Sequence, residues 1–115
     1  MTSSDRIQQK KEQIAKMSAD EGRKRLEQLE ERALADDNFN RALENDRNWE
    51  IFESVDDGGL ERLMKMADAG NKQAMYDTAA VFTLIGNQLR KQNDNKGSFF
   101  AILNANLWVE EAQKV

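Results

Sequence analysis

The sequence of 115 residues contains no histidine, no cysteine and no proline. Histidine and cysteine supply many of the general bases, nucleophiles and metal ligands of enzymes, so the usual sources of catalytic chemistry are missing. Without cysteine there is no disulfide framework and no thiolate metal site, which is compatible with a reducing compartment. We therefore expect a non-catalytic protein without a cofactor or a metal, whose function lies in contacts with another macromolecule.

Long hydrophobic stretches are also missing. Residues 1–6 lack the apolar region of a signal peptide, and no stretch approaches the roughly 18 apolar residues that a transmembrane helix needs. The simplest expectation is a soluble cytoplasmic protein with no membrane partner.

The abundant residues favour helices. Glutamate, lysine, leucine, alanine and arginine are frequent, and these side chains lose little rotamer freedom in a helix. We predict an all-α fold in the form of a small helical bundle. Residues 1–35 would form a charged arm of one long helix or a helix pair, and residues 36–115 a helical domain that ends in a repeat-like helix pair over 60–115.

The net charge of -4 is unevenly distributed. Residues 36–68 carry 10 acidic and 4 basic side chains, whereas residues 1–35 carry 7 acidic and 8 basic ones. An acidic field repels phosphate and attracts a basic protein surface, so we expect a protein partner, with a basic surface as one option, and no direct contact with nucleic acid. The alternative is that these acids only form a solvated surface.

Two helix starts are visible in the arm. Ser3, Ser4 and Asp5 can cap a first helix. Ser18 and Glu21 have the spacing of a capping box, so that either a second helix begins there or one long helix continues through it.

The apolar positions of the arm do not keep a coiled-coil heptad. Leu26 and Leu29 lie on one side of a helix, out of phase with Ile7 and Ile14. Two interpretations remain open. In the first, the arm is a docking helix or a dimerisation helix, and dimerisation would make the protein a homo-oligomer. In the second, the arm lies across its own domain or frays in solution.

The acidic middle of the chain predicts two short helices. Asp36 and Asp37 give a loop and cap signal, and aromatic residues around Trp49 follow at helical spacing. An aromatic cluster of this kind usually faces inward, so we expect Trp49 in the core; if it is exposed, it becomes the best candidate for an interface anchor. The acidic and glycine residues from 56 to 59 predict a turn.

The C-terminal half predicts closely packed helices. Gly70 stands where a C-terminal cap is expected and Asn71 restarts a helix, with a polar connection over 89–97 and a last helix after Ser98. Alanines on the two long helices allow a close antiparallel approach. The residues involved are Ala67 to Tyr76, Ala79, Phe82, Gly86, Asp94, Ala105, Trp108 and Ala112.

This pattern resembles a Sel1-like repeat, a relative of the tetratricopeptide repeat, over roughly residues 60–115. The resemblance implies a helix pair that serves as a protein-binding scaffold and carries no catalytic residues.

The apolar run from Phe99 to Leu103 exceeds what one helix face needs. Either it belongs to a fully buried last helix, or Phe100, Leu103 or Leu107 forms an exposed patch for self-association or docking. The adjacent pairs of acids, Glu110 and Glu111 included, point about 100° apart on a helix and are expected to be solvated.

Two functions are consistent with these features. The first is an adaptor or assembly protein that binds through its repeat-like surface and its charged arm, and tolerates salt. The second is a small acidic inhibitor, of the immunity, antitoxin or anti-defence kind, that covers a basic site of a nuclease or toxin and loses affinity in salt. The candidate partner-binding residues are Asp36, Asp37, Glu44, Asp46, Trp49, Glu50, Glu53, Leu26, Leu29 and Phe100.

Overall fold

The computed structural model describes residues 1–54 and 57–115, and within these ranges the chain forms seven helices and no strand. The fold is all-α, as predicted. The helices are α1 (Ser3–Ala15), α2 (Ala19–Leu34), α3 (Asp37–Glu44), α4 (Asp46–Glu53), α5 (Gly59–Asp68), α6 (Lys72–Lys91) and α7 (Asn95–Gln113).

Short polar side chains begin most of the helices. Ser18 accepts a hydrogen bond from the backbone of Glu21 and starts α2, so the arm is a helix pair. Asn71 starts α6 in the same way, directly after Gly70, whose φ of +96° ends α5. The turn predicted over residues 56–59 falls partly outside the described residues, which do not include 55 and 56.

Two helix starts differ from the sequence expectation. Thr2, and not one of the three residues after it, caps α1 in a capping box with Asp5. Asp94 caps α7 by accepting a hydrogen bond from Gly97, so α7 begins at Asn95 and not after Ser98. In both cases a polar residue earlier in the chain accepts the hydrogen bond from an unpaired backbone N–H. As a result, the connection between α6 and α7 is only residues 92–94.

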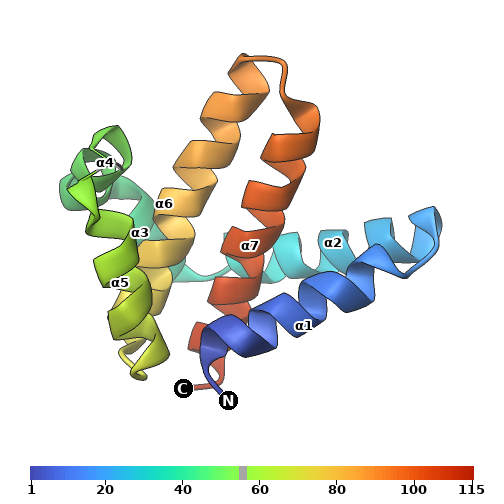
Figure 1. Cartoon of the computed structure of the whole chain (residues 1–115), viewed down its shortest axis with the longest axis horizontal. Coiled ribbons are helices and arrows are strands. Elements are labelled where there is room, and N and C mark those ends of the chain that lie inside the picture. The colour runs from blue at the N-terminus through green and yellow to red at the C-terminus, as the bar shows by residue number, and fades with distance from the viewer. Residues whose placement is uncertain (55–56) are drawn as a thin grey trace.

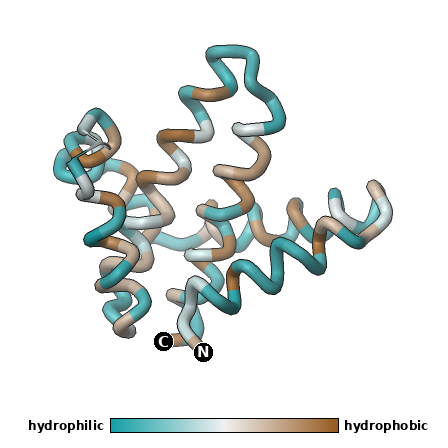
Figure 2. The backbone as a smooth tube through the Cα atoms, in the orientation of Figure 1, coloured by the Kyte–Doolittle hydropathy of each residue, from teal (hydrophilic) through white to brown (hydrophobic). Residues whose placement is uncertain are grey.

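The two long helices α6 and α7 form an antiparallel hairpin at the centre of the molecule (Figure 1). Helices α3, α4 and α5 pack on α6, while α1 and α2 pack on α7. Figure 2 shows that α1 and the loop between α6 and α7 are largely hydrophilic. The hairpin is tight at Gly86, where an added Cβ would lie 2.7 Å from Ile102 Cδ1.

The arm and the rest of the chain share one hydrophobic core. Ile7 and Ile14 of α1 and Leu29 and Ala33 of α2 are buried in the same cluster as Trp108 of α7. Leu103 and Leu107 are also buried. No helix in the described ranges combines the length and the apolar character needed to cross a bilayer.

Trp49 does not lie in the core. Its side chain is 44% exposed, while its neighbour Asn48 is 2% exposed and donates hydrogen bonds to Ala42 O (2.9 Å) and Asp77 Oδ1 (3.0 Å). The prediction of a core position was therefore wrong, because α4 is turned so that a hydrogen-bonded asparagine faces inward.

Candidate interaction surfaces

Glu110 and Glu111, near the C-terminal end of α7, are buried in an ionic network. The Glu110 carboxylate accepts hydrogen bonds from Lys10 Nζ (2.6 Å), Arg25 Nη2 (2.9 Å) and Arg32 Nη1 (3.4 Å). Glu111 accepts from Arg6 Nε at 2.6 Å and from Lys10 Nζ at 3.3 Å. The two glutamate side chains are only 8% and 2% exposed. The C-terminal end of α7 thus holds both helices of the arm, α1 and α2, through ion pairs.

The network keeps both glutamates ionised. Burial by itself raises the pKa of Glu110, but hydrogen bonds from Lys10 and Arg25 outweigh it and hold the pKa below its ordinary value. The pKa of Glu111 is lowered in the same way by Arg6 and Lys10 against its burial. These carboxylates therefore act as structural anchors that hold the arm against α7.

The expectation that this acidic pair is solvated was wrong. The sequence contains a signal that could have revealed the network: Arg6 and Lys10 are four residues apart, Arg25 and Arg32 are seven apart, and each pair therefore shares one helix face. Two basic faces on the arm favour carboxylates opposite them when the arm packs on its own domain.

A groove lies where α1, α2 and the first half of α7 meet. Its volume is about 570 Å³, and its apolar wall consists of Ile14, Leu26, Phe99, Phe100 and Leu103. Small residues of the arm, Ala15, Ala19 and Gly22, leave the space open. Volumes of this order accept several large apolar side chains.

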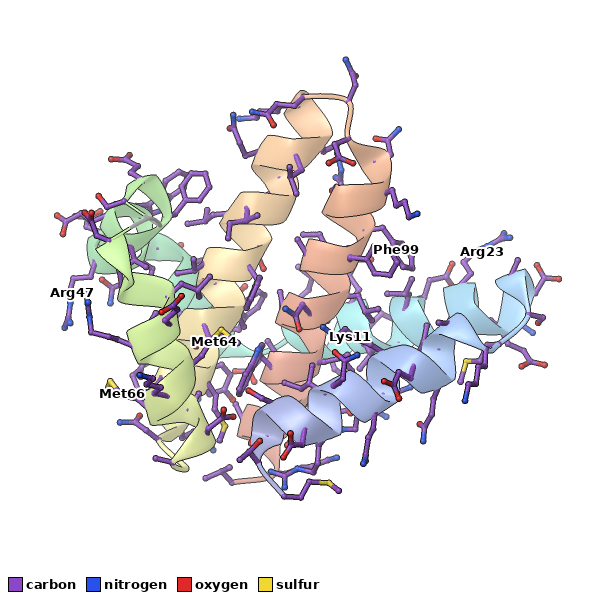
Figure 3. All side chains as sticks on the ribbon, in the orientation of Figure 1. Lys11, Arg23, Arg47, Met64, Met66 and Phe99 are labelled. Carbon is purple, nitrogen blue, oxygen red and sulfur yellow. The ribbon has the colours of Figure 1, made fainter. Side chains whose placement is uncertain are left out.

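The edge of the groove is aromatic and cationic. Phe99 and Phe100 are 43% and 46% exposed and form an edge-to-face pair with ring centres 5.4 Å apart. Lys11 and Arg23 also line the groove. No carboxylate lies among its described lining residues, but Asp20 pairs with Arg23 at 3.3 Å, and Glu12 lines the adjoining hollow with Lys11 and Phe100. Figure 3 shows Lys11, Arg23 and Phe99 on the same side of the molecule, far from Met66 and Arg47.

A second exposed surface follows α4. Asp46, Glu50 and Glu53 are three or four residues apart and share a face with Trp49, and all four side chains are exposed. We call these four residues the α4 stripe. None of its carboxylates forms an ion pair within the described part of the chain.

Trp49 is fixed in place on this stripe. Its indole N–H donates to Leu43 O at 3.1 Å, and its ring meets Phe52 edge to face at 6.1 Å. On the side toward α6 it borders a shallow hollow with Arg90 and Lys91. A rigid, half-exposed tryptophan loses little entropy on binding, which suits an interface anchor.

The structure separates the remaining candidate residues. Asp36 is occupied within the chain: its carboxylate accepts hydrogen bonds from Tyr76 Oη (2.7 Å), Gln113 Nε2 (3.1 Å) and the backbone of Asn38 (2.9 Å). Burial raises the Asp36 pKa, but the bonds from Tyr76 and Gln113 outweigh it and lower the pKa overall. Its role is to join α3 to α6 and α7.

The other candidate residues differ in how far their side chains are exposed. Asp37 and Glu44 are exposed on α3, and Leu26 is half-buried in the wall of the groove. Leu29 is only 1% exposed, so the folded chain does not offer it to a partner. The arm uses Leu29 for its own core, and Leu26 and Phe100 are the apolar candidates that the structure brings together.

Comparison of this chain with protein-family models, with curated proteins and with solved structures finds no match.

Proposed function

We propose that the chain is a non-catalytic protein-interaction module of the cytoplasm, an adaptor or assembly protein that binds its partner in the groove between α1, α2 and α7. The observation that carries this proposal is the half-exposed pair Phe99 and Phe100 beside an open apolar groove. Exposed aromatic side chains next to a concave apolar surface are typical of binding sites for protein segments.

The scaffold of the groove is well suited to binding. Its walls come from three helices, and the ionic network at Glu110 and Glu111 fixes two of them against the third. A groove that is held in place before binding loses less entropy when a partner enters. The missing histidine and cysteine support a non-catalytic role.

Co-purification with matched variants tests this proposal. Phe100→Asp places a charge at the groove, whereas Met66→Asp places the same charge at a residue of similar exposure, 48% against 46%, on distant α5. A protein that binds through the groove should be retained by the wild type and by Met66→Asp. Its affinity for Phe100→Asp, measured with both proteins purified, should fall at least about tenfold, or about 1.4 kcal/mol.

Equal binding to both variants would contradict the groove as the binding site. Circular dichroism should show that Phe100→Asp keeps the helical content, because a side chain that is nearly half exposed can be replaced at little cost in stability.

The resemblance of residues 60–115 to a Sel1-like unit is part of the same proposal. It is supported by the small residues in the hairpin of α6 and α7, since Ala79 of α6 and Ala105 of α7 are both fully buried and the two helices pack against each other. Such units serve as protein-binding scaffolds, which agrees with a role in recognition.

The α4 stripe favours a second candidate function, the small acidic inhibitor. Its exposed carboxylates would cover a basic site on a nuclease or toxin. Changing Glu50 and Glu53 to lysine should then abolish binding of the basic target, whereas Phe100→Asp should leave it unchanged. The adaptor function predicts the opposite pattern.

A further inference from the structure

The groove and the α4 stripe are complementary in both polarity and charge. The groove offers an apolar wall with Lys11 and Arg23 at its edge, and the stripe offers an exposed Trp49 with carboxylates on either side. We propose that the occupant of the groove is the α4 stripe of a second copy of this chain. This inference rests on the proposed function, because it names the partner of the same groove.

The contact would use the large and rigid side chains of both surfaces. The ring of Trp49 would lie against Phe99 and Phe100, where edge-to-face aromatic pairs add stability beyond the area that they bury. Glu50 and Glu53 would then lie near Lys11 and Arg23. The ion pair of Arg23 with Asp20, at 3.3 Å, joins side chains that are 68% and 84% exposed, so exchanging that partner costs little.

A symmetric dimer through two grooves is a poorer solution. It would bring the cationic edges of both copies toward each other, and like charges across an interface are unfavourable. The groove also cannot receive the stripe of its own chain, because α4 and the arm lie at opposite sides of the molecule (Figure 1). The interface is therefore head to tail, with different surfaces contributed by the two copies.

A head-to-tail contact leaves one groove and one stripe free at the ends of every open assembly. Such contacts build rings when the rotation closes and open chains when it does not. One two-turn helix in a groove covers less than the standard interface area of about 1,600 Å², so the association is weak and concentration-dependent. Salt should weaken it, because the charges at its edge are exposed to solvent.

Sedimentation velocity of the full chain is the first experiment, at concentrations from about 10 μM to about 1 mM, which spans weak association. The wild type should sediment faster as its concentration rises, and the shift should shrink in 0.5 M salt. Two variants then test the geometry: Phe100→Asp blocks the groove, and Glu50→Lys with Glu53→Lys reverses the stripe. Each variant alone should remain a monomer at every concentration.

The decisive sample is the equal mixture of the two variants. Each supplies the intact surface that the other lacks, so the mixture should form a one-to-one dimer that does not grow further. Met66→Asp and Glu61→Lys are controls, because they make the same kinds of charge change at exposed residues of α5, and they should assemble like the wild type.

Two results would overturn the inference. A wild type that stays monomeric at about 1 mM in low salt would exclude self-association of useful strength. An assembling wild type whose two variants do not combine in the mixture would exclude the head-to-tail contact. Neither result touches the groove as a binding site for another protein, which the co-purification with Phe100→Asp and Met66→Asp decides separately.

Discussion

Replacing Glu110 with glutamine removes one charge from the ionic network and keeps the shape of the side chain. The carboxylate is 8% exposed and lies within 3.4 Å of cations on both helices of the arm. Removing one partner of a buried pair costs about 3–5 kcal/mol when the other partner stays buried.

The loss of stability expected for Glu110→Gln is smaller than the range for a fully buried ion pair. Lys10 and Arg25 are 21% and 27% exposed and Arg32 is 59% exposed, so these cations can recover part of their hydration. The glutamine oxygen can still accept a hydrogen bond. We expect the free energy of unfolding to fall by about 2 kcal/mol at pH 7, or about 30-fold in the equilibrium constant.

Urea unfolding, followed by circular dichroism and by the fluorescence of the two tryptophans, measures this loss. With a slope of about 1.3 kcal/mol/M, the midpoint should move down by about 1.5 M. Glu27→Gln is the matched control, because it removes the same charge from an exposed position of α2. It should change the free energy of unfolding by less than about 0.5 kcal/mol.

The pH dependence gives a second, independent readout. The pKa of Glu110 is lower in the folded protein than its ordinary value of 4.5. Its contribution is therefore fully present above pH 4.5 and is lost as the pH falls through the folded pKa below that value. The difference between the wild type and Glu110→Gln should thus be full at pH 7 and should shrink in acid.

Two results would refute this reasoning. One is a difference in unfolding free energy below about 0.5 kcal/mol at pH 7, which is the size expected of an exposed residue. The other is a difference that stays the same at pH 7 and pH 3, because then the charge of Glu110 would not be its cause.

Three further predictions concern single residues. Burial and the bond to Asp36 raise the pKa of Tyr76, the only tyrosine, to about 12, so absorbance at 295 nm should titrate well above pH 10; a midpoint near 10 in the folded protein would contradict this. Gly70→Ala should cost about 1 kcal/mol because φ is +96° there, whereas Gly22→Ala should stabilise by about 0.5–1 kcal/mol, because Gly22 lies in the first turn of α2 and an added Cβ would meet only Ile14 O, at 4.0 Å. Thermal melts in which both substitutions shift the melting temperature in the same direction would exclude the backbone explanation. Ser98 Oγ is buried without a hydrogen-bond partner in the described structure, so Ser98→Ala should be neutral or stabilising by up to about 1 kcal/mol. A fall of more than about 1 kcal/mol in the free energy of unfolding, measured in urea, would show that the Ser98 hydroxyl has a hydrogen-bond partner.

Local chemistry in the sequence was sufficient for most of the helices. Ser18, Asp36 and Asn71 cap backbone N–H groups two or three residues away, and the positive φ of Gly70 is also a local property. The starts of α1 and α7 were misplaced by a few residues because several residues able to cap stand side by side there. The resemblance to a Sel1-like unit, the partner and the oligomeric state stay predictions.

The spacing of hydrophobic residues did not determine which helix faces are buried and which are exposed. Spacing shows which side chains share a helix face, but a face is buried only when another helix covers it. Asn48 turned inward on α4 because Ala42 O and Asp77 accept its hydrogen bonds, and this left Trp49 exposed.

The sequence by itself determined the helical class, most helix ends and the acidic middle of the chain, because these depend on residue type and on contacts within one turn. The tertiary structure alone decided that the arm lies on α7, that Glu110 is buried among cations, and that Ile14, Leu26 and Phe100 surround one groove. Helix α7 lies about 60 residues or more beyond α1 and α2 in the chain, so only the packing of these helices brings the residues together.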